Sequence, residues 1–384
     1  MSRPAVTDTP PAIVVTTADG CALELRHDEG PAAREDRPAV LLVHGASAGS
    51  DTFRIGEVQT LVDYLRGYGL DVWTLDWRAS LRRVRDVYCT ALGTGRLPTT
   101  FTIDAAAEHD VPAALLAMRR APHNVRGKVA VLGHCMGGAI VAQGIARGTI
   151  ESADVEHVVL TGLGLFYRAA IDNVLKAEDR VLEDLLGGGQ HLLHPTKGWD
   201  RNVCTRDPDD GPWPPLLEDP YGVWLDTPLP HDCAVEICHR LSYMFGMPFI
   251  PDKIRRIHDG GYLPTQFGYI ALEFLIHCCQ NLRRGYAAPF VADRTGPLPV
   301  DRRYLRREAF QDRRITLITG DLNSLWHRDS IDTMYEWLRR GRRDEQPRSL
   351  QKHVVPGFGH QDLYWAADAP SLVFPKILEG LGRP

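Results

Sequence analysis

The chain has 384 residues, of which 44% are hydrophobic and 24% are charged, a composition typical of a globular protein with a large core. Its formal net charge of −5 gives no basic footprint for nucleic acid or an anionic membrane. No apolar run approaches the length that spans a bilayer, and the N-terminal stretch lacks the apolar core of a signal peptide, so we expect a cytoplasmic protein.

Strand and helix patterns alternate along the first part of the sequence. The predicted segments are a hairpin of 12–17 and 21–27, strands at 39–43, 71–76, 129–132 and 155–160, and helices at 58–68 and 104–120. The strand 39–43 is apolar throughout, as expected for a parallel strand that is buried on both faces. This alternation predicts an α/β protein with a mostly parallel central sheet.

The pattern changes after Tyr167. For roughly 145 residues, helical stretches such as 235–245 and 271–284 are separated by Gly- and Pro-rich breaks. So long a departure from the alternation needs a structure of its own, and a lid is the usual role. We therefore expect a mainly helical lid over residues 167–313.

The strand and helix alternation resumes near the C-terminus. The predicted segments are strands at 314–319 and 351–355 and helices at 329–340 and 370–381. Residues 1–166 and 314–384 are therefore expected to form one core, which the lid interrupts.

The strand 129–132 runs into Gly133-His134-Cys135-Met136-Gly137, and a helix of small residues follows. A single reactive side chain between glycines, on a sharp turn from strand to helix, is typical of a nucleophile elbow. The helix start also favours a thiolate through its free N–H groups and dipole. The alternative is a buried structural cysteine at a tight contact. Eight scattered cysteines do not resemble a disulfide framework, so we expect a reduced thiol.

His360 is the candidate base. It follows the last predicted strand within Pro356-Gly357-Phe358-Gly359-His360, which gives the chain order nucleophile, acid, histidine known for such sheets. A thiol that attacks a carbonyl needs a base of this kind. The alternative, an exposed loop histidine, would be preferred only without Cys135.

The group that orients His360 is left open between two residues. In Gly320-Asp321-Leu322-Asn323, the position three residues past the glycine, where a carboxylate is common, holds Asn323, and Asp321 lies one residue past it. A carboxylate would orient the imidazole and stabilise its cation, whereas an amide only orients it. An amide suffices more readily for cysteine, because a thiolate–imidazolium pair is expected at moderate pH. Asp362 is a third candidate.

Main-chain N–H groups are expected to hold the oxyanion. Met136 directly follows the nucleophile, and Ala46 lies in the turn after the strand 39–43. Neither role depends on a side chain, so the small Ala46 is compatible with it.

No cofactor is implied, and no metal is expected. The spacing of His231, Cys233, Cys238 and His239 does not match common zinc sites. Arg82, Arg83 and Arg85 either form a solvated face or meet an anionic carrier such as coenzyme A.

The sequence resembles α/β-hydrolase-fold proteins over nearly its whole length, through LLVHGASAGSDTF, DVWTLDWR, GHCMGG, ITGDLN and PGFGHQD. More narrowly, it is similar to the hydrolase-like proteins and domains that accompany cholesterol oxidases, through HGASAGSDTF, DWRAS, ICHRLSYMFG, TGDLNSLW and GFGHQDLYWAADAPSLVFPKIL. Those relatives typically carry serine in the elbow, so Cys135 is a departure, and they tend to have asparagine where Asn323 stands.

Two other families share part of the pattern. Polyhydroxyalkanoate synthases resemble the chain in the G-x-C-x-G-G elbow and the Asp76-Trp77 pair, but their Gly-x-x-Asp loop is missing. Dienelactone hydrolases share the cysteine elbow but are smaller and have no such lid.

The residues and the resemblance together predict a cysteine-dependent acyl enzyme that acts on an ester, lactone or thioester. Because a thioester acyl-enzyme transfers to a good acceptor faster than it hydrolyses, acyl transfer, cyclisation or condensation in small-molecule biosynthesis is preferred. The alternatives are a plain hydrolase and a ligand-binding protein that has lost turnover. We expect a small-molecule acyl partner, free or bound to a carrier or coenzyme A, with no nucleic acid and no membrane; the oligomeric state stays open.

Overall fold

The computed structural model describes residues 3–30, 39–80, 101–120, 122, 125–178, 192–194, 198–199, 238, 241–242, 245–293, 296–340 and 349–383. Several predicted features lie outside these ranges, namely Arg82, Arg83, Arg85, His231, Cys233, His239 and most of the helix at 235–245.

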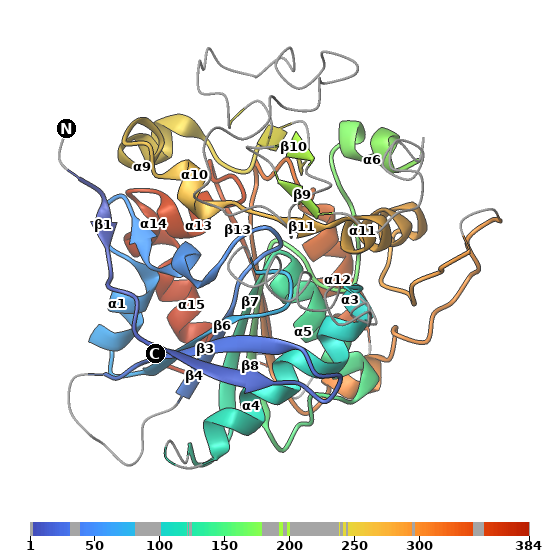
Figure 1. Ribbon diagram of the computed structural model, residues 1–384, viewed down its shortest axis with the longest axis horizontal. Coiled ribbons are helices and arrows are strands. Elements are labelled where there is room, and N and C mark those ends of the chain that lie inside the picture. The colour runs from blue at the N-terminus through green and yellow to red at the C-terminus, as the bar shows by residue number, and fades with distance from the viewer. Residues whose placement is uncertain are drawn as a thin grey trace.

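Within the described ranges, the core is an eight-stranded sheet (Figure 1). Its spatial order is β13 (Leu350–Val355), β12 (Arg314–Gly320), β8 (Val155–Thr161), β7 (Val129–His134), β4 (Ala39–Val43), β6 (Asp71–Asp76), β3 (Ala22–Asp28) and β2 (Ala12–Thr16). The strands from β13 to β6 run parallel, and β3 and β2 form an antiparallel edge. The predicted α/β fold with a mostly parallel sheet is confirmed, and each predicted strand falls on a strand of this sheet.

Helices cover both faces of the sheet. One layer contains α4 (Val111–Arg119), α5 (Met136–Arg147) and α12 (Asp329–Arg339), and the other contains α1 (Leu61–Gly67) and α15 (Phe374–Gly380). Along β4, Leu41 and Val43 pack into the first layer, whereas Val40 and Leu42 pack into the second. This alternation between two buried faces explains why β4 is apolar at every position.

Two predicted helices are interrupted, both at prolines. The segment 104–120 consists of α3 (Ile103–Ala105), a π-helical turn (Ala106–Asp110) and α4, whose first turn contains Pro112. The segment 370–381 is divided into α14 (Ala369–Leu372) and α15, whose first turn contains Pro375. Proline lacks an N–H and clashes with the carbonyl four residues before it, so a regular helix cannot continue through it.

Between β8 and β12 the chain leaves the sheet, and we call this segment, residues 162–313, the insertion. Its described elements are α6 (Ile171–Glu178), β9 (Leu192–His194), β10 (Gly198–Trp199), a 3₁₀ helix (Pro251–Ile254), α9 (Arg255–Asp259), α10 (Leu263–Gln266), β11 (Ile270–Ala271), α11 (Leu272–Arg284) and a second 3₁₀ helix (Arg307–Phe310). The helix predicted at 271–284 corresponds to α11. The strands β10, β9 and β11 pair antiparallel and were not predicted, because they are too short to show an alternating pattern.

Described elements of the insertion, among them α9, α10, β9 and β11, lie across the edge of the sheet where the parallel strands end (Figure 1). The insertion is joined there to the loop after β4, because the Gly268 N–H donates to the Ser47 carbonyl at 2.8 Å and the Ser47 hydroxyl donates to the Gly268 carbonyl. The remaining short elements are β1 (Ala5–Val6), which pairs with β5 (Ile55–Gly56), a 3₁₀ helix (Ser50–Phe53) and α13 (Asp362–Trp365).

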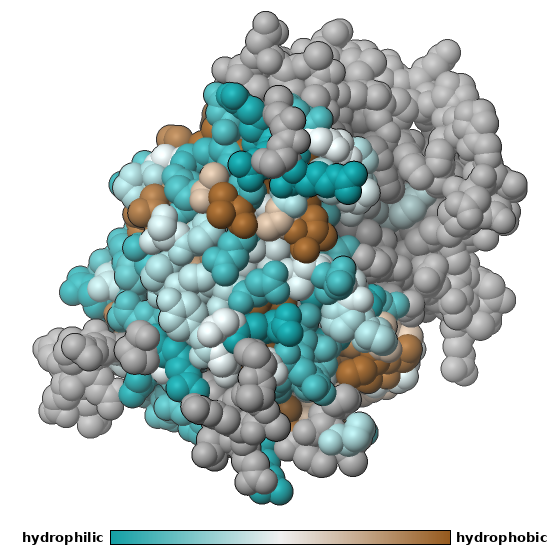
Figure 2. Space-filling view, turned by 90° about the vertical axis from the view of Figure 1, so that its left-hand side faces the viewer, coloured by the Kyte–Doolittle hydropathy of each residue, from teal (hydrophilic) through white to brown (hydrophobic). Residues whose placement is uncertain are grey.

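The surface is mixed in character. On the face shown in Figure 2, hydrophilic side chains predominate and the hydrophobic ones form small separate patches. Over the described residues, no helix combines the length and the apolar character needed to cross a membrane.

The contact between the turn after β7 and the end of β4 leaves no room for a side chain. A Cβ atom on Gly137 would lie 2.2 Å from the Val43 carbonyl oxygen and 2.5 Å from that of His44. We expect Gly137→Ala to lower the free energy of unfolding by about 1–3 kcal/mol, because main-chain atoms cannot move aside cheaply. Gly67, on α1 with open space around it, provides the control, since Gly67→Ala should be neutral or stabilising by up to about 1 kcal/mol. Urea unfolding measures both, and a Gly137→Ala variant as stable as the wild type would contradict this packing.

Candidate active site

Cys135 lies at the turn between β7 and α5. Its φ of 55° and ψ of −124° belong to a backbone region that residues with side chains rarely adopt. The turn is held because the Cys135 N–H donates to the Thr161 carbonyl at 2.8 Å and the Ala139 N–H donates to the Cys135 carbonyl at 3.1 Å. The sequence pattern of a strand, a sharp turn and a helix therefore corresponds to a strained turn with the thiol at its apex.

Three N–H groups face the buried sulfur of Cys135. Burial raises the pKa of the thiol to about 11, and this rise is opposed by hydrogen bonds from the Trp326 side chain and from the main-chain N–H groups of Met136 and Ala46. The structure thus places the two predicted main-chain donors beside the sulfur, together with an indole N–H.

A buried carboxylate fixes the loop that carries Ala46. Asp76, at the end of β6, accepts from the N–H of Ser50 at 2.8 Å and from its hydroxyl at 2.7 Å. The indole of Trp77 donates to the His44 carbonyl at 3.0 Å. Although burial opposes ionisation of Asp76, hydrogen bonds from His44 and Ser50 hold its pKa below the usual range. The Ala46 N–H is therefore positioned by the sheet rather than by its own short side chain.

Trp326 is a site residue that the sequence patterns did not single out. It lies in the loop between β12 and α12, and its ring packs edge-on against Tyr167, with 5.4 Å between the centroids. No motif identifies a tryptophan as a donor to a distant thiol. Its signals were its position three residues after Asn323 and its place at the end of the stretch TGDLNSLW.

His360 is buried in the turn between β13 and α13, so the alternative of an exposed loop histidine is excluded. Burial lowers the pKa of its imidazole to about 3. Its ring packs against that of His134, the residue before Cys135, with 4.5 Å between centroids. A Cβ on Gly162 would lie 2.8 Å from His360 Cε1, so this glycine makes room for the ring. The Nε2 atom is buried without a hydrogen-bond partner among the described residues, so no direct hydrogen bond joins His360 to the Cys135 thiol in this structure.

Of the two residues left open by the sequence, the structure brings Asn323 to the imidazole. Asn323 Nδ2 lies 3.0 Å from His360 Nδ1. Asp321 is turned away, because its carboxylate accepts from the Gly357 N–H at 2.6 Å on the exposed side of the loop. Of the two alternatives, Asn323 is therefore the one that contacts the imidazole in this structure.

Asp362, the third candidate, has a different contact. It accepts from the N–H of Gly359 at 2.7 Å and from that of Ile250, in the insertion, at 3.1 Å. Burial raises its pKa to about 7. This carboxyl group therefore ties the turn that carries His360 to the insertion.

The direction of the Asn323 amide follows from its other partners. Its Oδ1 accepts from the main-chain N–H groups of Leu325 and Trp326, both at 3.2 Å. Because those groups can only donate, the reverse orientation would bring N–H against N–H. The amide N–H of Asn323 therefore donates to His360 Nδ1, and the proton of the neutral imidazole lies on Nε2.

This arrangement keeps the thiol and the imidazole neutral in the free site. The pKa is raised to about 11 for Cys135 and lowered to about 3 for His360, by burial first in both cases. The expected thiolate–imidazolium pair at moderate pH is therefore wrong for this structure. Burial disfavours both the Cys135 thiolate and the His360 imidazolium. The Asn323 amide supplies no negative charge to stabilise the imidazolium.

The cluster considered for zinc has one described member, Cys238. Its sulfur lies 3.3 Å from His258 Nε2, and His258 Nδ1 lies 2.7 Å from Asp259. Among the described residues, no group of three or more His, Cys, Asp or Glu side chains is arranged to hold a metal ion.

The sequence model described as "Alpha/beta hydrolase family" matches residues 40–375, and a search of curated protein sequences gives no significant match.

Three similar solved structures come from bacteria. A hydrolase from Pseudomonas aeruginosa PA01 is 15% identical, with 98% of this chain and 100% of that chain covered and a TM-score of 0.55. An esterase from Rhodococcus sp. ECU1013 is 12% identical (97% and 98% covered, TM-score 0.53), and a thermophilic esterase from Thermogutta terrifontis is 14% identical (97% and 98% covered, TM-score 0.51). These likenesses concern the fold, and the sequence match extends over most of the chain: the protein belongs to the alpha/beta hydrolase family.

Proposed function

We propose that the protein is a cysteine-dependent acyl enzyme in which Cys135 attacks an activated carbonyl. The observation that supports this most directly is the convergence of the Ala46 and Met136 N–H groups on a sulfur at a strained turn. An oxyanion formed on a carbon bonded to that sulfur would lie within reach of both donors. In this proposal, the Trp326 indole stabilises the thiolate.

The weakness of the base favours a thioester as the acyl donor. A thiolate, with a thiol pKa of about 8.5, leaves far more readily than an alkoxide and needs little protonation. His360 directs its basic nitrogen at Asn323, so it gives little general-acid or general-base help. In the proposed step, the bond from Sγ to the acyl carbon forms, the substrate carbon–sulfur bond breaks, and the Cys135 proton passes to the departing sulfur.

The weak basicity of His360 also favours acyl transfer over hydrolysis. Water needs a base to attack an acyl-enzyme, whereas an amine or thiol acceptor is already a good nucleophile. Transfer, cyclisation or condensation is therefore our first choice. Hydrolysis of an ester, lactone or thioester is the second candidate, which the family membership and the fold shared with esterases favour. Product analysis with and without an amine acceptor separates the two. The narrower similarity to proteins that accompany cholesterol oxidases stays a prediction.

The nucleophile assignment predicts a covalent adduct. Incubation with acyl thioesters should add the acyl mass to the wild-type protein and not to Cys135→Ala, as measured by intact mass spectrometry. Cys278→Ala is the matched control, because this thiol on α11 lies close enough to Cys135 for their charges to interact, and it should still form the adduct. An adduct that persists in Cys135→Ala would reassign the nucleophile. Tight ligand binding without any adduct or turnover would support the non-catalytic alternative.

Because Cys135 and His360 are both neutral at moderate pH, the reactivity of the thiol should depend on pH in a particular way. With a Cys135 pKa of about 11 and a His360 pKa of about 3, the thiolate fraction should rise about tenfold per pH unit from about pH 6 to pH 9. The rate of alkylation of Cys135 by iodoacetamide, corrected with Cys135→Ala, should rise over this range without a plateau. An inflection near pH 6–7 would indicate a titrating imidazole partner and contradict the assignment.

Replacing Asn323 by aspartate should reverse the tautomer. A carboxylate accepts from Nδ1–H, which frees Nε2 as a base and raises the imidazole pKa, and the opposite change in a serine-protease triad costs about 10⁴-fold in kcat. We expect Asn323→Asp to raise the hydrolysis rate of a model thioester at least tenfold and to introduce an inflection in its pH profile. Asn323→Ala, which removes the amide without adding charge, should bring no such gain. A rate and profile equal to the wild type in Asn323→Asp would show that the amide does not control the tautomer.

A further inference from the structure

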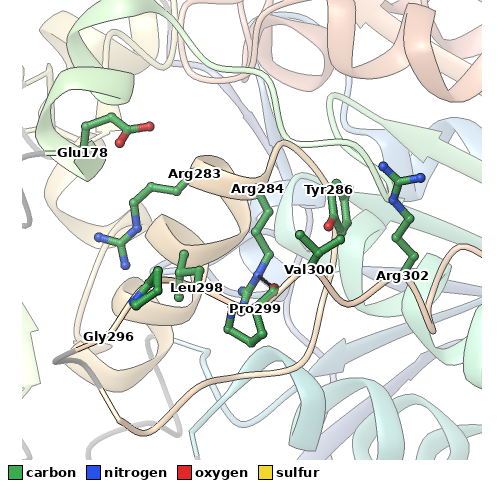
Figure 3. A pocket seen from close by; sticks show the side chains of 10 residues that line it. Glu178, Arg283, Arg284, Tyr286, Gly296, Leu298, Pro299, Val300 and Arg302 are labelled. Carbon is green, nitrogen blue, oxygen red and sulfur yellow. Dashed lines mark hydrogen bonds between the residues drawn. The ribbon is translucent and has the colours of Figure 1, made fainter.

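A pocket of about 500 Å³ lies at the C-terminal end of α11 (Figure 3). Its walls come from the last turn of α11, the end of α6 and the chain 296–302. This volume suits a small organic molecule rather than a single ion. The residues assigned to the acyl chemistry do not line it, so its role is a separate question.

The pocket combines a cationic and an apolar surface. Arg283, Arg284 and Arg302 contribute guanidinium groups, and the apolar part comes from the segment Leu298–Val300 with the ring of Tyr286. Among the described lining residues, Glu178 is the one acidic side chain, and Figure 3 shows it at the far end of the pocket from Arg302. An occupant that matches these walls carries negative charge at one end and an apolar or planar body.

Arg284 is the most unusual of these side chains. Its Nε donates to the Pro299 carbonyl at 3.3 Å, and neither Nη1 nor Nη2 has a hydrogen-bond partner among the described residues. Burial and the neighbouring charge of Arg283 lower its pKa from the usual arginine value. Burying guanidinium N–H groups without acceptors is costly, so an anion brought against them would be bound strongly.

The charges of Asp301 and Asp104 act favourably on Arg284, but these carboxylates form their ion pairs with Arg303 and Arg147. Asp301, next to Arg302 in the chain, is paired with Arg303 at 2.7 Å. Arg302 lies over the ring of Tyr286 at 6.0 Å, and no carboxylate of a described residue forms an ion pair with Arg302 or Arg284. Arg283 is engaged in part, since its Nη1 donates to the Ala177 carbonyl at 3.0 Å.

We propose that this pocket binds an organic phosphate. A phosphate offers three acceptor oxygens and up to two negative charges, which suits a pocket lined by three arginines better than the single charge of a carboxylate. The rest of the ligand lies on Tyr286 and the apolar chain of Leu298–Val300. The proposal does not depend on the chemistry of Cys135. A nucleotide and a carrier such as coenzyme A share the required phosphate chemistry.

Calorimetric titration distinguishes a nucleotide from a carrier such as coenzyme A as the natural ligand. We expect ADP and coenzyme A to bind, and adenosine, the uncharged counterpart of ADP, to bind at least tenfold more weakly or not at all. Tighter binding of coenzyme A than of ADP would identify a carrier, and equal binding would identify the nucleotide part; both support the proposal. Absence of binding by both phosphates, or adenosine and inorganic phosphate each matching ADP, would overturn it.

Two variants and a control variant test whether ADP binds in this pocket. Arg284→Met and Arg302→Met, which keep the apolar stem, should each weaken ADP binding at least tenfold. Arg255→Met, at an exposed arginine paired with Asp252 in another part of the insertion, should bind as the wild type does. In the free protein, Arg284→Met should melt no lower than the wild type, because it removes two buried guanidinium nitrogens that have no acceptor among the described residues. Unchanged ADP affinity in both variants, or a lower melting temperature of Arg284→Met with undiminished affinity, would show that the arginines are only structural.

Discussion

The close approach of the turn at Cys135 to the ends of its neighbouring strands is the constraint on which the site depends. Gly137 packs against the last carbonyls of β4, and the Cys135 N–H is bonded to Thr161 at the end of β8. Because these contacts leave one position for the turn, the sulfur comes to lie beside the first N–H of α5 and beside the loop that follows β4. The donors around the sulfur are therefore a product of strand order and main-chain packing, and the side chain of Ala46 contributes nothing to them.

The protonation states of Cys135 and His360 follow from their burial. Burial removes the charge from the thiol and from the imidazole alike, and the residue that would restore it in a conventional triad is an amide. In the proposed mechanism, these N–H donors stabilise the thiolate when it forms. This balance suits a substrate that is already activated and whose leaving group departs as a stable anion, which is why the proposed acyl donor is a thioester.

Much of this was predictable from the sequence because it depends on position along the sheet. Apolar runs such as 39–43 indicated the strands, Cys135 and Met136 were predicted from the glycine-flanked turn, and Ala46 and His360 were predicted from their positions after strands. The choice between Asp321 and Asn323 depended on which way one loop turns, which spacing cannot reveal. Trp326 was missed because its indole acts across the fold, and β9 to β11 were missed because they are too short to carry a period.

The bonds between Ser47 and Gly268 have a mechanical consequence. Ser47 adjoins Ala46 and has a φ of 58°, so its backbone has little freedom to absorb a displacement. Movement of the insertion at Gly268 must either break both hydrogen bonds or carry Ala46 with it. A displacement of the chain at Gly268 is therefore coupled to the position of the Ala46 N–H, one of the groups that face the Cys135 sulfur.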